Sequence, residues 1–155
     1  MSAADDLEVV PLRLTDDVLE KLLEFDRDSQ AMNFPGDSPN REATAERIRR
    51  EYAEEPEGMH LVLHRGEIVG CLFMKTKLNP YRRCKFLDLR NIYLTSAYRS
   101  KGFGRKLLEV MEGYARRKGC RYLYLGTSAE NREARRAFEK FGFKLTRVIM
   151  EKDLP

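Results

Sequence analysis

A β-rich run that leads through a two-glycine turn into an amphipathic helix constrains this sequence more than any other feature. The run covers residues 85–95, and residues 103–118 repeat apolar side chains with a helical period. Between them, residues 99–106 set Gly102 and Gly104 among four basic side chains. Two such glycines allow successive backbone N–H groups to face one concavity at the positive end of the helix dipole. The turn therefore predicts a binding site for a diphosphate group.

Other interpretations of the glycine turn can be weighed against this one. A dinucleotide-binding fingerprint requires a third glycine at the position where Leu107 stands. A Walker A loop requires Gly-Lys followed by Ser or Thr, but this turn continues as Gly-Arg-Lys-Leu. Both patterns are therefore excluded. A plain glycine turn without a ligand stays open as an alternative, although the four cations and the following helix favour a bound anion.

The rest of the chain alternates strand-like and helix-like segments. Strands are predicted at residues 7–14, 59–64, 67–77, 85–95, 122–125 and 143–150. Helices are predicted to begin after Thr15, at Ser38-Pro39, at Phe103 and after Asn131, and the last two to stop at Gly119 and Gly142. The order β-α-α-β-β-β-α-β-α-β predicts an α/β (α+β) fold with a mixed central sheet and helices on its faces. We expect one domain over residues 1–155.

Composition excludes several classes of protein. Of the 155 residues, 42% are hydrophobic, which is enough for one core and argues against disorder. The longest apolar run, residues 68–74, is far shorter than the roughly 20 residues that span a bilayer. Residues 1–6 are not apolar, so no secretory signal is expected. The three cysteines form no CxxC pair, which is typical of a cytoplasmic protein, and His60 and His64 have no companions at metal-ligand spacing.

Charge is divided unevenly along the chain. Residues 1–80 hold 10 basic and 17 acidic side chains, a net charge of −7, whereas residues 81–155 hold 19 basic and 8 acidic side chains, a net charge of +11. Eight of these 19 cations lie between Arg82 and Lys106, around the glycine turn. We therefore expect the basic part to face an anionic ligand and the acidic part to attract a cation.

Two blocks of residues resemble one known family. Arg99-Ser100-Lys101-Gly102-Phe103-Gly104 matches R/Q-x-x-G-x-G/A, the acetyl-coenzyme A signature of the GNAT superfamily of N-acetyltransferases. Asn131-Arg132-Glu133-Ala134 and residues 138–143 are similar to that family's N-x-x-A…Y-E-K-x-G-F segment. The blocks stand at the family's usual separation, and the predicted order of elements is also that of the family. The resemblance is strong over residues 86–143 and weak elsewhere.

The resemblance implies a sheet that splays between the strands predicted at residues 85–95 and 122–125, with acetyl-coenzyme A entering the gap. The residues that it assigns to this cosubstrate are the backbone of Ile92, Tyr93 and Leu94 for the pantetheine arm, then Arg99, Ser100, Lys101, Gly102, Phe103, Gly104 and Arg105 for the diphosphate, and finally Asn131 and Phe138 near the thioester. It also implies that an acetyl group passes directly to a primary amine in a ternary complex, without a metal.

Two positions depart from the family's usual mechanism. Phe138 stands where many members have a tyrosine that donates a proton, and Gly126 stands where one branch has a basic glutamate. Asp88 is the predicted replacement for the base, because another branch places its catalytic glutamate four residues before the position of Ile92. An ion pair between Asp88 and a nearby cation is the alternative. The backbone N–H of Leu94 is the candidate donor to the oxyanion.

The acceptor and the partners are constrained less tightly. The polar loop at residues 28–38 and the acidic part of the chain favour a cationic acceptor, such as a polyamine, an amino sugar or a peptide amine. A homodimer is compatible with the sequence. One alternative function is an acetyl-coenzyme A sensor of the same fold without transferase activity. A second is a basic nucleic-acid-binding module, which is not expected because no aromatic–basic block of the RNA-recognition type is present.

Overall fold

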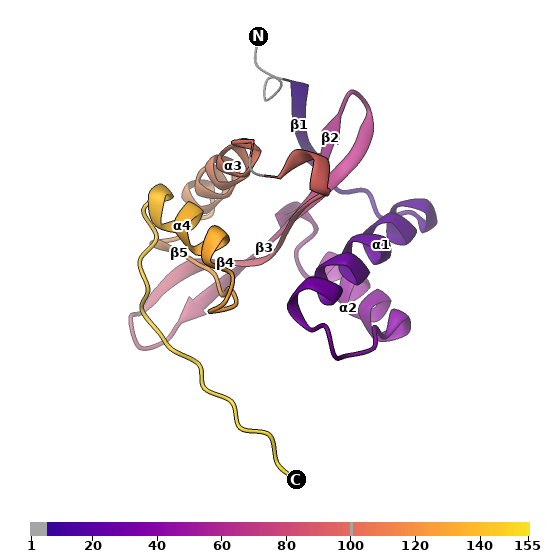
Figure 1. Cartoon of the computed structure of the whole chain (residues 1–155). Helices are drawn as coiled ribbons and strands as arrows, with labels where there is room; N and C mark the ends of the chain where they lie inside the picture. The colour runs from indigo at the N-terminus through magenta and orange to yellow at the C-terminus, as the bar shows by residue number, and fades with distance from the viewer. Residues whose placement is uncertain (1–5, 100) are drawn as a thin grey trace.

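The computed structural model describes residues 6–99 and 101–155. The elements in chain order are β1 (Leu7–Pro11), α1 (Asp16–Asn33), α2 (Arg41–Glu54), β2 (Met59–His64), β3 (Glu67–Asn79), β4 (Cys84–Leu94), α3 (Phe103–Arg117), β5 (Tyr122–Tyr124) and α4 (Arg132–Phe141), with short 3₁₀ turns at Pro56–Gly58 and Ser96–Tyr98. Figure 1 shows their arrangement.

A five-stranded sheet in the order β1-β2-β3-β4-β5 forms the centre of the molecule. Neighbouring strands are antiparallel except for β4 and β5, which are parallel. The hairpin predicted at Arg65-Gly66 joins β2 to β3, and both residues have the positive φ angles (50° and 83°) that tight hairpin turns require. The mixed α/β fold predicted from the order of elements is confirmed.

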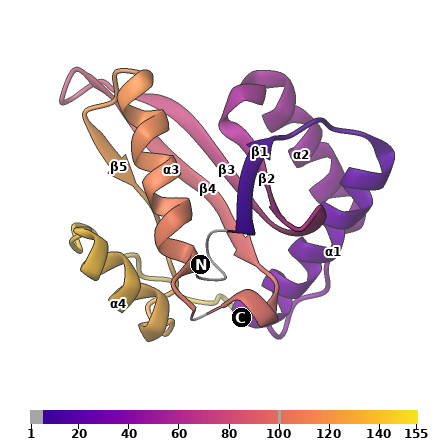
Figure 2. The same cartoon turned by 90° about the horizontal axis from the view of Figure 1, so that it is seen from above.

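Helices cover the sheet on both faces, so the sheet has a core on each side. Helices α1 and α2 lie on one face, and α3 lies on the other (Figure 2). The buried part of β3 shows the division, because successive side chains of a strand point to opposite faces. Leu72 and Met74 pack in the core under α3, whereas Cys71 and Phe73 pack in the core under α1 and α2.

Side-chain caps set the helix boundaries. Thr15 accepts a hydrogen bond from the backbone N–H of Val18 at 3.3 Å, which confirms the predicted start of α1. Helix α2 begins later than predicted, because Asn40 rather than Ser38 is its cap and accepts from the N–H of Ala43 at 3.0 Å. Helix α3 ends just before Gly119, whose φ of 73° suits a residue without a Cβ.

The strand predicted at residues 143–150 is not formed, and this prediction was wrong. Residues 143–155 leave α4 as an extended segment and pair with none of the described strands (Figure 1). The segment has the apolar content of a strand, but a strand is stable only when its backbone groups pair with a neighbour.

Candidate active site

Strand β4 pairs with β5 over only part of its length. They are paired only from Phe86–Tyr122 to Asp88–Tyr124, and β5 ends there. Strand β4 continues to Leu94, so its residues 89–94 present an edge that no described strand covers. A bulge in β4 between Leu89 and Asn91 adds a local bend to this stretch. The predicted splay between the fourth and fifth strands is therefore present.

Backbone N–H groups on the open edge of β4 are available to a ligand. Thr95 donates its N–H to Val69 of β3 at 2.9 Å. Because the hydrogen-bonding direction alternates along an antiparallel strand, the N–H groups of Leu94 and Ile92 point away from β3, to the open edge. The carbonyl oxygen of Leu94 faces the same way, since it accepts the Nε–H of Arg99 at 2.7 Å.

The backbone of Tyr93 faces β3 instead. A Cβ placed on Gly70 of β3 would come within 2.2 Å of the Tyr93 carbonyl oxygen, which shows how closely the two strands approach there. Of the three residues predicted to offer backbone groups, the geometry therefore points to Ile92 and Leu94. Tyr93 contributes its side chain, which lies on the face covered by α1 and stacks on Phe25 with ring centroids 4.6 Å apart.

The glycine turn leads from this edge into α3. Gly102 has a φ of 81° and caps α3 with no side-chain hydrogen bond to the first turn. A Cβ on Gly102 or Gly104 would meet no atom of the described residues within 4 Å, so these residues leave space beside both glycines. Lys101 is exposed, and Arg105 is exposed and pairs with Glu109 at 3.3 Å. This arrangement fits a diphosphate at a helix N-terminus.

The remaining residues predicted for the turn have different surroundings. Phe103 is only 3% exposed and anchors the start of α3 in the core. Arg99 points away from the turn, because its Nη2 donates to the Asp28 carboxylate at 2.9 Å and its guanidinium lies 5.2 Å from the centre of the Tyr93 ring. Ser100 lies outside the described residues.

A hollow of ≈ 400 Å³ lies between α1 and the end of β4, lined in part by Glu24, Asp28, Tyr93 and Thr95. The hydroxyl of Tyr93 donates to the Asp28 carboxylate. This hydrogen bond, with the one from Arg99, holds the pKa of Asp28 below its ordinary value. Burial, together with Asp28, raises the pKa of Tyr93 to about 12. At neutral pH the hollow therefore contains an ionised carboxylate beside a protonated phenol.

The hydrogen bond between Tyr93 and Asp28 was not predicted from the sequence. Tyr93 and Asp28 are 65 positions apart, and Arg99 and Asp28 are 71 apart. No local pattern joins them, because they meet only after α1 packs on the sheet. The one available signal was the Asp28 carboxylate itself, at the start of the polar loop predicted to border the acceptor.

Comparison with known proteins now decides the family. Residues 20–143 match the model of the acetyltransferase (GNAT) family. The chain belongs to this family. The uncharacterized N-acetyltransferase YycN of Bacillus subtilis is 33% identical over 94 residues, which cover 61% of this chain and 59% of that protein. The uncharacterized N-acetyltransferase YhfO of B. subtilis is 28% identical over 79 residues, 51% of this chain and 53% of that protein. The chain thus spans little more than half the length of these relatives.

Solved structures show the same fold at low identity. A possible acetyltransferase from Clostridium difficile 630 superposes with a TM-score of 0.77 at 16% identity, covering 96% of this chain and 98% of that one. A chain of the NatC complex bound to Gag peptide and CoA superposes with a TM-score of 0.76 at 18% identity, covering 92% of this chain and 87% of that one. These likenesses show that the chain has the fold of those proteins.

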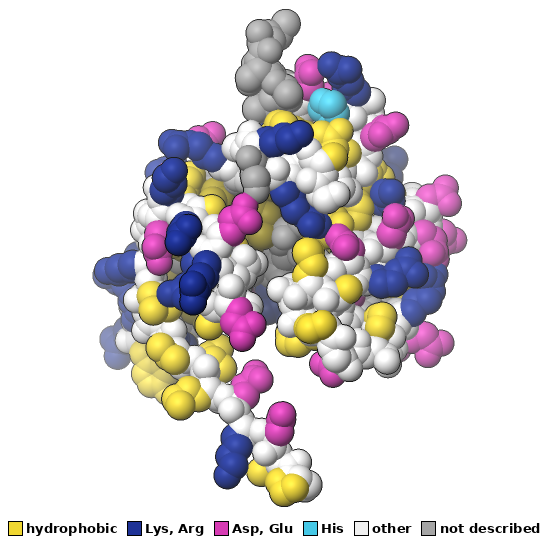
Figure 3. Space-filling model, viewed as in Figure 1, with side chains coloured by type: hydrophobic (Ala, Val, Ile, Leu, Met, Phe, Trp, Pro, Cys, Tyr) yellow, Lys and Arg dark blue, Asp and Glu magenta, His cyan; other side chains and the backbone are white. Residues whose placement is uncertain are grey.

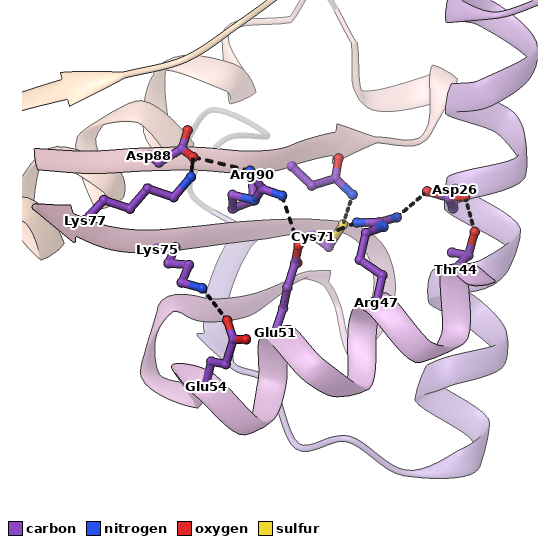
Figure 4. Close-up of polar contacts among 11 residues, drawn as sticks. Asp26, Thr44, Arg47, Glu51, Glu54, Cys71, Lys75, Lys77, Asp88 and Arg90 are labelled. Carbon is purple, nitrogen blue, oxygen red and sulfur yellow. Dashed lines mark hydrogen bonds and ion pairs between the residues drawn. The ribbon is translucent and has the colours of Figure 1, made fainter. Parts of the chain in front are cut away.

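Asp88, the predicted base of this GNAT protein, lies at the last position of β4 that pairs with β5. It is 6% exposed, and its Oδ2 accepts from Lys77 Nζ at 2.6 Å and from Arg90 Nη1 at 3.3 Å. Figure 4 shows these contacts, which continue from Arg90 to Glu51 of α2. The ion pair given as the alternative for Asp88 is therefore formed, and the role of a base stays a prediction.

Asn131 and Phe138 belong to α4. The Oδ1 of Asn131 accepts from the N–H of Ala134 at 3.2 Å, so the asparagine caps the helix. Phe138 packs against the core under α3 and against Phe143, with ring centroids 5.8 Å apart. Their assignment to the thioester end of the cosubstrate stays a prediction for this GNAT chain.

Residues 6–99 and 101–155 contain neither a candidate metal site nor a candidate membrane-spanning helix. No three His, Cys, Asp or Glu side chains come together there in a way that could hold a metal ion. No helix in this part of the chain is long and apolar enough to cross a membrane.

Proposed function

We propose that this GNAT protein transfers an acetyl group from acetyl-coenzyme A to a primary amine of a small molecule or a peptide, by direct attack in a ternary complex. The observation that carries the proposal is that the open edge of β4 is followed, after the 3₁₀ turn at Ser96–Tyr98, by the glycine turn at the start of α3. A ligand with amide groups at one end and a diphosphate at the other matches this order of binding groups, in which the backbone edge of β4 comes first and the glycine turn second. When bound, acetyl-coenzyme A supplies an acetyl group activated as a thioester.

Each part of the reaction has a candidate group in this chain. The N–H of Leu94 points to the open edge of β4, where it can donate to an oxygen that gains negative charge. Gly102, Lys101 and Arg105 would hold the diphosphate. The acceptor must lose a proton before it attacks, since an alkylammonium group has a pKa of about 10 and no lone pair. Asp88 is the proposed receiver of that proton.

We also infer that the acceptor is a cationic amine that enters through the hollow beside α1. Glu24 and Asp28 line this hollow, and Arg27 is the cation on its wall. Both carboxylates are already in ion pairs, Asp28 with Arg99 at 2.9 Å and Glu24 with Lys21 at 3.6 Å. Their side chains are nevertheless 48% and 60% exposed, so each keeps oxygen surface on which an ammonium group could bind.

An amine panel tests the proposed function. The full chain is incubated with acetyl-coenzyme A and with polyamines, amino sugars, peptides with free amines, and neutral or anionic amines, and the released thiol and the mass of the product are measured. We expect thiol release with cationic amines. A preference for neutral or anionic amines would contradict the proposed acceptor class. Binding of coenzyme A by calorimetry without thiol release for any amine would favour the sensor alternative.

A further inference from the structure

The hairpin between β3 and β4 carries exposed side chains that the proposed reaction does not use. Residues 80–83 form its turn, between the end of β3 and the start of β4. Tyr81 in this turn is 96% exposed, and Arg82, Arg83 and Lys85 are exposed as well. The hairpin tip stands at one corner of the molecule (Figure 2), and Figure 3 shows basic and hydrophobic side chains side by side in this region. The turn therefore presents an aromatic ring and several cations to the solvent.

Four cations around the hairpin tip form no ion pair with a carboxylate of the residues that the structure describes: Arg82, Arg83, Lys85 and Arg121. Arg121 belongs to this group because it donates its backbone N–H to the Lys85 carbonyl at 2.8 Å. By contrast, Lys77 of the same hairpin pairs with Asp88 at 2.6 Å. A local excess of positive charge attracts an anionic partner.

The turn is fastened to β5, so its exposed groups are held in place. The Asn79 Oδ1 accepts from the backbone N–H groups of Tyr81 and Arg82, both at 3.1 Å. The Asn79 Nδ2 donates to the Tyr122 hydroxyl at 2.8 Å. The Arg82 guanidinium lies 4.4 Å from the centre of the Tyr122 ring, which stacks on Phe86 with ring centroids 5.1 Å apart. A ligand would meet a surface that is already ordered, which lowers the entropy cost of binding.

Arg83 adopts a backbone conformation that favours glycine. Its φ is 51°, in the left-handed region that residues with a Cβ rarely occupy. In the hairpin between β2 and β3, Arg65 has a similar φ of 50°, but it pairs with Asp6 at 3.3 Å. Arg83 has no such ion pair within the described part of the chain. A strained position that keeps a cation without using it in the fold points to a role for that charge in binding.

The kinds of group at the hairpin tip favour a nucleic acid over an acidic protein segment. One flat face of the Arg82 guanidinium lies over Tyr122, so its other face can extend the stack, and the Tyr81 ring is exposed. Nucleic-acid bases stack on aromatic rings and on guanidinium planes, whereas a carboxylate side chain offers no comparable flat surface. Phosphates supply the negative charge that the cations attract. An unpaired strand meets both needs, because its bases are free to turn outward.

We propose that the hairpin tip binds a single-stranded nucleic acid, with bases stacked on Tyr81 and Arg82 and phosphates held by Arg83, Lys85 and Arg121. The sequence does not show these residues as one block, since Arg121 joins the others only where β5 meets β4. Strand β4 is 11 residues long, which places its end at the acceptor hollow about 30 Å from the tip. The surface is thus separate from the candidate active site, and the proposal does not rest on acetyl transfer.

Fluorescence anisotropy on the full chain tests the proposal, with labelled oligouridine and oligothymidine of about 12 nucleotides as probes. We expect both to bind, and to bind more weakly when the salt concentration rises from about 50 to 200 mM. Tyr81→Ala should weaken binding by about 10-fold or more, and Tyr81→Phe should retain it, because the ring carries the stacking contact. The ratio of the two dissociation constants shows whether RNA or DNA is preferred.

Arg83→Gly separates binding from folding. The variant removes a cation and also relieves the left-handed φ, so the chain should melt no lower than the natural one. Binding of both oligonucleotides should nevertheless weaken severalfold and depend less steeply on salt. Arg65→Gly is the matched control, because it makes the same change of residue and of charge in the other hairpin. It should leave both dissociation constants unchanged.

Four results would overturn the proposal. The first is no binding of either oligonucleotide at about 50 mM salt. The second is equal weakening by Arg83→Gly and Arg65→Gly, which would assign the binding to net charge alone. The third is unchanged affinity in Tyr81→Ala, which would remove the stacking contact. The fourth is tighter binding of polyglutamate than of either oligonucleotide, which would assign the surface to an acidic protein.

Discussion

Arg99 is the first residue of the glycine signature, yet its side chain acts at a distance from the turn. Its guanidinium joins the Leu94 carbonyl on β4 to the Asp28 carboxylate on α1 and lies over the Tyr93 ring. The first residue of the signature therefore ties β4 to the helix that borders the proposed acceptor hollow.

Tyr93→Phe should raise the pKa of Asp28 toward its ordinary value, because the Tyr93 hydrogen bond is the largest cause of the lowering. The variant should also lose about 1 kcal/mol of stability at pH 7, the usual worth of one hydrogen bond. A depressed carboxyl pKa stabilises the fold above the unfolded-state value of 3.8 and stops doing so as the pH falls through the folded value, so the difference should vanish in acid. Carboxyl NMR titration and urea unfolding measure both effects.

A matched substitution controls for loss of a tyrosine hydroxyl in general. Tyr122→Phe removes a hydroxyl that accepts a hydrogen bond from Asn79 at 2.8 Å. Tyr122 is far from Asp28 in the sequence and lies on β5, whereas Tyr93 lies on β4. This variant should leave the titration of Asp28 unchanged. An Asp28 pKa that stays the same in Tyr93→Phe would show that the hydrogen bond does not govern it.

Asp88→Asn separates the two roles considered for this carboxylate. If Asp88 receives the proton of the amine, turnover at saturating acetyl-coenzyme A should fall by about 10²-fold or more and the pH–rate profile between pH 6 and 9 should change shape. Lys77→Gln is the control, because it removes the 2.6 Å ion pair but keeps the carboxylate. Equal turnover and an equal profile for Asp88→Asn and the natural chain, with lowered stability in both variants, would leave Asp88 only the structural role.

At the scale of elements, the two glycines of the turn before α3 differ in backbone conformation. Gly102 has a φ of 81°, so Gly102→Ala should cost about 1–2 kcal/mol of stability and weaken the binding of coenzyme A. Gly104 lies in the first turn of α3 with open space around it, so Gly104→Ala should keep binding and add up to about 1 kcal/mol through helix propensity. Thermal unfolding and calorimetry of coenzyme A binding measure these changes; equal melting of the two variants would contradict the strain at Gly102.

Elements whose signals are local could be predicted from the sequence, and elements that depend on distant partners could not. Some helix ends are set by groups within the same turn of chain, as at Thr15, Gly119 and Gly142. The ends predicted at these residues were right within a residue or two. The start of α2 was wrong because Ser38 and Asn40 are both good caps and only packing selects one. The strand predicted at residues 143–150 was wrong because a strand forms only where its backbone pairs with a neighbour, and an apolar pattern does not show whether that pairing takes place.

The same distinction holds for the site. The glycine turn and the open edge of β4 follow from contiguous residues, so the motif located them. The contacts of Asp28 with Tyr93 and Arg99 depend on how α1 packs on the sheet, and the motif alone assigned Arg99 to the diphosphate. Backbone alternation, visible only in the register of β3 and β4, then distinguishes Leu94 and Ile92 from Tyr93.

At the scale of the whole molecule, the uneven charge of the sequence is partly cancelled by folding. Ion pairs join the two parts of the chain at Asp28–Arg99, Glu51–Arg90, Lys77–Asp88 and Glu57–Lys118. In three of these pairs a carboxylate of residues 1–80 holds a cation of residues 81–155, and in Lys77–Asp88 the two charges are reversed. Protonation of carboxylates in acid would therefore weaken the joining of the two parts as well as raise the net positive charge.

His60 should make the stability of the whole fold depend on pH below about 6.5. Burial lowers the pKa of His60 below the ordinary value of 6.5, and its Nδ1 is buried without a hydrogen-bond partner in the described part of the chain. Below about pH 6.5 the unfolded chain therefore binds a proton at His60 that the folded chain does not bind. As the pH falls, this group lowers the free energy of unfolding by up to about 1.4 kcal/mol per pH unit.

Urea unfolding at pH 7.5 and 5.5 measures this loss of stability. His60→Gln should flatten this dependence, whereas His64→Gln, which alters a ring bonded to the Tyr98 hydroxyl at 2.7 Å, should retain it. A slope that is unchanged in His60→Gln would assign the pH dependence to other groups.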